Sequence, residues 1–108
     1  MQLRFDQIDN DFLGHLSLLS PFGVGNRKPL FLTQGAEVLM KPQKIQGKHS
    51  KFILKQSGKI FKALGWGKGE WTEMFNKGDR LDLAYSLQIS EYLGEERLNL
   101  SLEDVRRG

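Results

Sequence analysis

The chain has 108 residues and no cysteine; 39% of its residues are hydrophobic and 27% are charged. This length suits one domain and leaves little room for a second core. The absence of cysteine excludes a disulfide framework and thiolate metal sites, and it is typical of a reducing compartment, so we expect a cytoplasmic location. No apolar run approaches the roughly 18 residues of a membrane span, and the N-terminus lacks a secretory signal, so no membrane partner is expected.

The net charge of +3 conceals an uneven distribution. Residues 27–68 contain ten Lys and Arg residues against Glu37 alone, which gives this block a net charge of +9. Residues 1–26 carry −2 and residues 69–108 carry −4. A lysine-rich block is either a solvated face or a surface that binds polyanions, because clustered Lys and Arg displace counterions from phosphates. Composition alone leaves both interpretations open.

The first predicted element is a short helix over residues 10–19. Three good N-cap residues stand at positions 9–11, and apolar residues then recur at helical spacing. Residues 21–31 contain two prolines and two glycines, which indicates a connector between elements. We therefore divide the chain into residues 1–34, a helix with its connector, and residues 35–108, a folded domain.

After this connector the pattern becomes that of β-strands. A tight-turn signal at Ser57-Gly58 separates two of the predicted strands, and the clearest alternation of apolar and polar residues begins at Arg80. The predicted elements are, in order, strands at 37–40, 51–55 and 59–66, a short helix at 70–75, and strands at 80–92 and 98–102.

Five strands interrupted after the third by a helix follow the order of the OB-fold, a small Greek-key barrel. We therefore predict a mainly β protein, a five-stranded OB-fold barrel with a short helix between strands 3 and 4 and an N-terminal helix plus connector. Another small β-barrel is the alternative. Closing the barrel would bury the apolar face of the last hairpin against the second strand, which selects as core residues Leu81, Leu83, Leu87, Leu98, Leu100, Leu102, Phe52 and Leu54.

The residues with catalytic or metal-binding chemistry form no convincing site. His15 and His49 each lack a carboxylate or a second histidine at ligand spacing. The glycine-rich run at residues 65–69 lacks the spacing and the strand-to-helix context of a phosphate loop. No serine has a histidine and an acid placed to activate it. We therefore expect this chain to hold no metal or cofactor and to have no enzymatic activity of its own.

The basic block is better suited to binding a polyanion. In an OB-fold the second and third strands and the loops at their ends take oligonucleotides, with lysines on phosphates and aromatic rings on bases. Trp66 fits the core, the more usual place for this residue, but it also fits an exposed face beside Lys62. The candidate nucleic-acid-binding residues are Lys44, Lys48, His49, Lys51, Lys55, Lys59, Lys62, Trp66, Lys68, Tyr92 and Arg97.

The sequence also resembles a known family. Residues 21–26, Pro-Phe-Gly-Val-Gly-Asn, followed by Pro29-Leu30-Phe31, resemble the PFGxGNPxPxF signature that leads into the C-terminal OB domain of RecJ-type single-strand-specific exonucleases. Residues 78–85 resemble the fourth strand of that domain, and the segments 91–94, 98–100 and 104–106 resemble its closing hairpin. The sequence departs from the usual family residues at Arg27, Ser90 and Asn99.

The catalytic Asp-His-His and Gly-Gly-His motifs of that family have no counterpart here, so the divalent metal that they hold is expected outside this chain. The resemblance implies a stand-alone or excised, non-catalytic OB domain of a RecJ-like 5′-3′ exonuclease of DNA repair and recombination. Such a domain would bind single-stranded DNA and position it for a catalytic core elsewhere. The alternative is an OB module that docks repair proteins or other domains of the same nuclease.

Overall fold

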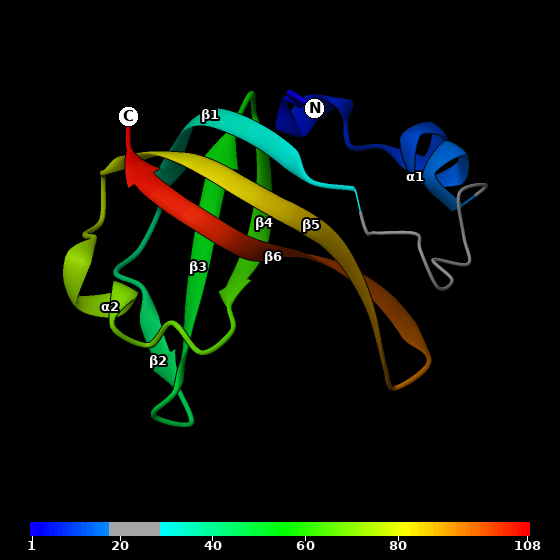
Figure 1. The fold of residues 1–108 in the computed structure, drawn as a ribbon. Helices are drawn as coiled ribbons and strands as arrows, with labels where there is room; N and C mark the ends of the chain where they lie inside the picture. Colours follow the sequence, from blue (N-terminus) through cyan, green and yellow to red (C-terminus); the bar gives the residue numbers. More distant parts are fainter. Residues whose placement is uncertain (18–28) are drawn as a thin grey trace.

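A computed structural model describes residues 1–17 and 29–108, without the side chains of residues 14–17, 89–92, 95 and 96. None of the helices in these ranges is long and apolar enough to cross a membrane. The elements are η1 (Phe5–Gln7), α1 (Asn10–Ser17), β1 (Phe31–Val38), β2 (Gln43–Ile45), β3 (His49–Gln56), β4 (Lys59–Gly65), α2 (Trp71–Met74), β5 (Arg80–Tyr92) and β6 (Glu95–Arg107), as Figure 1 shows.

The strands form one sheet in the order β1-β5-β6-β4-β3-β2, and a further pairing of β1 with β3 closes five of them into a barrel. β2 lies outside the closed barrel and, within the described residues, pairs only with β3. β4 and β6 are parallel, while all other pairs are antiparallel. The short helix α2 falls between the third and fourth barrel strands. This arrangement confirms the predicted OB-fold.

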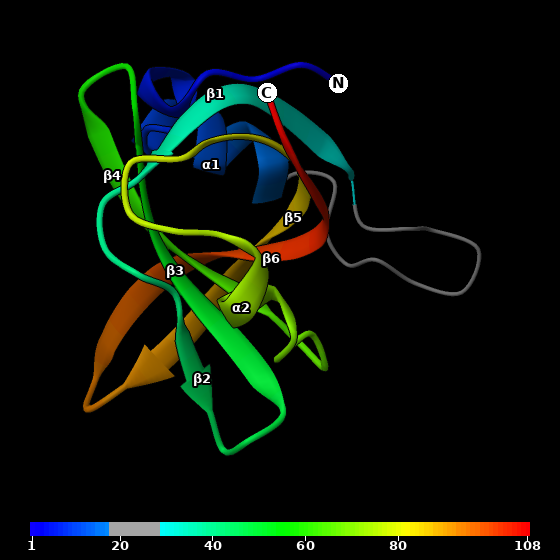
Figure 2. The same cartoon turned by 90° about the vertical axis from the view of Figure 1, so that its left-hand side faces the viewer.

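Short turns set the register of the hairpins. The turns after β2, β3 and β5 each place two successive residues at positive φ, Gln46-Gly47, Ser57-Gly58 and Leu93-Gly94. Positive φ at both central residues defines the type I′ turn, whose twist matches that of the flanking strands. The β5–β6 pairing shifts register between Ala84 and Tyr85 and then extends to Tyr92 and Glu95, so the hairpin projects beyond the barrel (Figures 1 and 2).

The first strand corrects the sequence prediction. β1 spans Phe31–Val38, whereas the pattern placed this strand at 37–40. Gly35, at φ +73°, lies where the pairing of β1 with β5 shifts register, so it forms a bulge that bends the strand around the barrel. The pattern also missed β2, which is three residues long. The predicted connector lies outside the described residues up to position 28.

The predicted helix at 10–19 is confirmed as α1 over its described part, residues 10–17. The division at residue 34 stays a prediction, but Leu3, Phe5 and Ile8 belong to the same core as the barrel. Here Phe5 makes edge-to-face contacts with Phe61 at 5.1 Å and Tyr85 at 6.4 Å between ring centroids. The N-terminal segment therefore contributes to the barrel interior.

The buried core contains most of the residues that the alternation selected. Phe52, Leu54, Leu81, Leu83, Leu100 and Leu102 are buried. Leu87 and Leu98 are only partly buried. They lie nearer the projecting end of the β5–β6 hairpin, where fewer residues of the barrel pack on the apolar face of the hairpin. At the opposite side of the core, the α2 segment fills the barrel end, with Trp71 and Phe75 packed on Phe52 at 6.4 and 6.1 Å.

A chain of buried hydrogen bonds joins the N-terminal segment to the barrel. Thr33 Oγ1 donates to the Leu3 carbonyl oxygen at 2.6 Å and accepts from the Tyr85 hydroxyl at 2.7 Å. Burial raises the pKa of Tyr85, while its hydrogen bond to Thr33 acts in the opposite direction. The phenol is therefore kept neutral, as the donor to Thr33 on β1.

Candidate nucleic-acid interface

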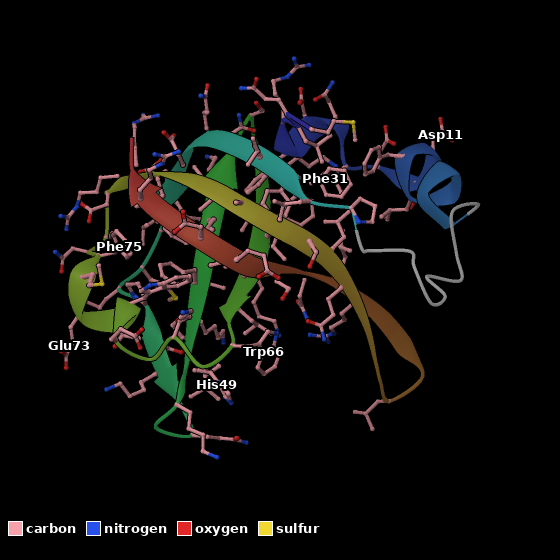
Figure 3. All side chains as sticks on the ribbon, in the orientation of Figure 1. Asp11, Phe31, His49, Trp66, Glu73 and Phe75 are labelled. Carbon is pink, nitrogen blue, oxygen red and sulfur yellow. The ribbon has the colours of Figure 1, made fainter. Side chains whose placement is uncertain are left out.

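Trp66 stands on the surface at the end of β4. Its side chain is 48% exposed, so the interpretation of Trp66 as a core residue is wrong. His49 meets it edge-to-face, with ring centroids 5.0 Å apart, and Trp66 Nε1 donates to Gln88 Oε1 at 3.3 Å. Figure 3 shows both rings at the end of the barrel near the β2–β3 hairpin. The indole is thus exposed yet held in one orientation.

Glycines after β4 bring this loop onto the β2–β3 hairpin. The Gly67 N–H donates to His49 Nδ1 at 2.7 Å, and the Gly69 N–H donates to the Lys48 carbonyl oxygen at 2.9 Å. A Cβ on Gly69 would lie 3.1 Å from that oxygen, so a side chain there would press on the hairpin backbone. The two loops are therefore bonded to each other around Trp66.

Three lysines surround this junction. Lys44 lies on β2 and Lys48 in the adjoining turn, and both are exposed. Lys68 follows Trp66 in the loop, and its Nζ lies 5.9 Å from the ring centroid of Trp71. We call Lys44, Lys48, His49, Trp66 and Lys68 the Trp66 cluster.

The outer face of β3 and β4 continues from the Trp66 cluster. Buried Phe52 and Leu54 alternate on β3 with side chains that point away from the core, Lys51 and Ile53. Across the ladder, Ile53 pairs with Lys62 of β4. This face carries lysines between apolar side chains, and it is the face on which OB-folds take oligonucleotides.

The remaining predicted residues do not gather at the Trp66 cluster. Lys59 and Lys55 lie toward the β3–β4 turn, at the other end of the two strands, and Lys55 pairs in register with Glu37. Arg97 is exposed on β6. Tyr92 ends β5, but its side chain lies outside the described ones. These predicted lysines are therefore spread along β3 and β4 and are not concentrated at one point.

Sequence reasoning missed Gln88 as the partner of the indole. Gln88 is a polar residue of an alternating strand, and its contact with Trp66 joins positions 22 residues apart. Lys41 belongs to the basic block, yet its Nζ donates to the Phe75 carbonyl oxygen and Asn76 Oδ1 after α2. In the described part of the chain no group of three or more His, Cys, Asp or Glu residues could hold a metal ion.

The closed barrel, its parallel β4–β6 contact and the placement of α2 define a small OB-fold domain. Residues 1–104 match the sequence profile of the RecJ OB domain, so the chain belongs to this family. The match confirms the resemblance carried by the sequence motifs.

Individual relatives agree with this assignment. The chain is 28% identical over 102 residues to the single-stranded-DNA-specific exonuclease RecJ of Bacillus subtilis, covering 93% of this chain and 13% of that protein. It therefore spans a small part of the length of this relative. RecJ of Thermus thermophilus in complex with Mn²⁺ has a similar fold, with TM-score 0.61 and 23% identity over 90% of this chain and 14% of that one.

A domain from another protein has a similar fold. The SSB domain of a Synechococcus protein matches with TM-score 0.63 and 20% identity, covering 75% of this chain and 97% of that domain. At this level of identity the likeness extends to the fold alone. Three quarters of this chain therefore correspond in fold to nearly the whole of that domain.

Proposed function

We propose that this domain binds single-stranded DNA through the Trp66 cluster and the outer face of β3 and β4. The observation that carries the proposal is the exposed indole of Trp66, which His49 and Gln88 hold among lysines. An unpaired base stacks on such a ring for about 1–3 kcal/mol, and lysines neutralise the adjoining phosphates. Because Nε1–H is already bonded to Gln88, the ring offers stacking without a hydrogen bond to a particular base.

We further propose that the domain acts within a RecJ-like exonuclease, where it holds the strand for a catalytic part outside this chain. The family assignment supports this role, since the relative from Bacillus subtilis is named a single-stranded-DNA-specific exonuclease. In such an enzyme, Trp66→Ala should raise KM for single-stranded DNA and leave kcat nearly unchanged. A fall in kcat with unchanged KM would contradict a holding role.

Fluorescence anisotropy with a labelled oligonucleotide tests binding by the domain. The logarithm of affinity should fall with the logarithm of salt concentration by about 0.7 per neutralised phosphate, or about 3.5 if five lysines engage. Triple replacement of Lys44, Lys48 and Lys68 by Ala should reduce this slope by about 2. Lys77→Ala, which removes one exposed lysine after α2, is the control for loss of a positive charge outside the Trp66 cluster and should leave the slope unchanged. A slope near zero would refute the proposal.

The indole requires its own controls. Trp66→Leu should weaken binding about tenfold, within the 1–3 kcal/mol of one stacked base, whereas Trp66→Phe keeps an aromatic face and most of the affinity. Unchanged unfolding midpoints would show that the loss is not due to unfolding. If both variants bound the oligonucleotide with the affinity of the wild-type, Trp66 would not be part of the interface.

Docking of a protein is the second candidate. Ile60 is 56% exposed on the outer face of β4, next to lysines, and apolar surface of this kind also suits a protein partner. A repair protein or another domain of the nuclease bound there would be retained in the presence of excess oligonucleotide. Displacement by the oligonucleotide would favour the DNA-binding proposal.

A further inference from the structure

A polar groove lies at the end of the barrel opposite the Trp66 cluster. It consists of two adjoining hollows of about 370 and 480 Å³, which share Gln34 and Gln56 in their walls. Figure 1 shows β3 running from the β2 end to the turn beside the N-terminus, so the two sites occupy opposite ends of one strand. We call it the glutamine groove, defined by Gln2, Arg4, Gln34, Lys55, Gln56 and Arg80.

The groove exists because two barrel strands separate. β1 and β3 pair only at Glu37 with Lys55 and at Val38 with Leu54. Beyond these pairs the Gln56 side chain spans the gap, accepting from the Phe5 N–H at 2.7 Å and donating to a β1 carbonyl oxygen at 3.5 Å. The N-terminal segment forms the far wall.

Several polar groups in the walls have no partner within the described residues. The side-chain amides of Gln2 and Gln34 make no hydrogen bond there. Each amide offers a donor and an acceptor side by side, which matches the edge of an unpaired nucleobase. Both glutamines line the hollows and are exposed to solvent, so their amides are accessible to a ligand.

Charge favours the same class of ligand. Arg4, Lys55 and Arg80 line the groove against Glu37 alone, while Asp6 pairs with Arg4 at its exposed edge, 3.1 Å from Nε. Guanidinium and ammonium groups of this kind bind phosphate oxygens. The groove therefore combines groups that suit a base with groups that suit a phosphate.

We propose that the glutamine groove is a second nucleotide subsite for the same DNA strand, at a fixed distance from Trp66; this rests on the proposed function. Seven residue steps of β3 separate His49 from Gln56, which corresponds to about 23 Å. A strand with stacked bases covers this distance with roughly seven nucleotides. Lys51, Lys62 and Lys55 lie along the intervening face. An oligonucleotide of four nucleotides can occupy one subsite at a time, whereas one of ten nucleotides can occupy both.

A length series tests the proposal. Anisotropy titrations would compare oligo-dT of four and ten nucleotides on the wild-type domain and on Gln34→Ala, Arg4→Ala and Trp66→Leu. Gln34→Ala and Arg4→Ala should each weaken the ten-mer about fivefold and leave the four-mer unchanged. Trp66→Leu should weaken both. The variant-to-wild-type ratio is compared at each length, because longer strands also bind in more registers.

Lys77→Ala is the control for loss of a positive charge outside both sites, and a ten-mer with abasic residues at both ends tests contact with bases. The abasic strand should bind the wild-type more weakly than the intact ten-mer binds Gln34→Ala, because it lacks the bases at both subsites. Equal effects of Gln34→Ala and Arg4→Ala on both lengths, or no effect on either, would overturn the second subsite. If Trp66→Leu still weakened binding in that case, the proposed function would stand. Absence of binding at any length would overturn both.

Discussion

Replacing Gly65 with Ala should destabilise the domain by about 1–2 kcal/mol. A Cβ at this position would lie 2.9 Å from Cε3 of Trp71 and would collide with the Ser50 hydroxyl oxygen. Overpacking of a core costs about 1–3 kcal/mol, and the reduced freedom of the unfolded chain offsets about 0.4–1 kcal/mol of that. The expected fall in Tm is about 4–8 °C for each kcal/mol. Gly65 therefore permits the close approach of β3, β4 and α2.

Ser50 provides the partner substitution. Its hydroxyl is fully buried and has no hydrogen-bond partner within the described residues. A buried polar group without a partner costs about 1–3 kcal/mol, so Ser50→Ala should stabilise the domain by about 1 kcal/mol. The same change removes one of the two collisions that an alanine at position 65 would meet. Gly65→Ala should therefore cost at least about 0.5 kcal/mol less in the Ser50→Ala background.

Urea unfolding of the wild-type, both single variants and the double variant measures this coupling. Tryptophan fluorescence is a suitable signal because Trp71 is buried in the native barrel. The m-values should agree, so that the midpoints report stability alone. Additive effects within about 0.3 kcal/mol would show that Ser50 is not the group that Gly65 accommodates. A neutral Gly65→Ala variant would refute the packing argument altogether.

Two further stability predictions follow from single residues. Leu93, 87% exposed at φ +53°, occupies a turn position that favours Asn, so Leu93→Asn should raise the free energy of unfolding by about 0.5–1 kcal/mol in urea titrations. Burial raises the pKa of Tyr85 in the folded state, so the unfolded state ionises first as the pH rises above 10. The contribution of the Tyr85 phenol to the free energy of unfolding is therefore complete below pH 10 and declines above it. Tyr85→Phe should cost about 1 kcal/mol at pH 7 by loss of the hydrogen bond to Thr33, and its deficit should shrink between pH 10 and 11.

Each of these predictions has a contrary result. A destabilised Leu93→Asn variant would mean that the leucine makes a stabilising contact within the domain. A deficit of Tyr85→Phe that stays constant from pH 7 to 11 would show that the phenol ionises equally in the folded and unfolded states. Urea titrations of the wild-type and Tyr85→Phe at three pH values between 7 and 11 measure this deficit.

The fold was predictable where one residue pattern alone determines the element. The alternation from Arg80 onward defined β5, and the turn residues at Ser57-Gly58 separated β3 from β4. The start of β1 was not predictable, because Pro29 before the strand and Gly35 within it are residues typical of a connector. In the structure Gly35 forms a bulge whose N–H donates to Asp82, which is distant in the chain.

The candidate interface was predictable as a set of residue types and much less as a geometry. Lysines on β3 and β4, and those beside the loop before β3, could be named because an OB-fold presents these strands and the loops at their ends. Strand alternation places Trp66 equally well inside or outside, and its exposure is decided by the loop that Gly67 and Gly69 bond to the β2–β3 hairpin. The glutamine groove arises where β1 and β3 separate, and no local pattern reports such a separation.

The position of β6 between β4 and β5 has a consequence for how the chain folds. The last strand supplies both the parallel pairing with β4 and the antiparallel pairing with β5. During synthesis, β3 and β4 can form a hairpin early, but β4 cannot pair with β6 until Leu100 and Ser101 have left the ribosome. Until then β4 and β5 expose unpaired edges, which invite pairing with other chains. Closure through contacts this distant in sequence is slow compared with hairpin formation, so we expect the pairing of β4 with β6 to form after the β3–β4 hairpin.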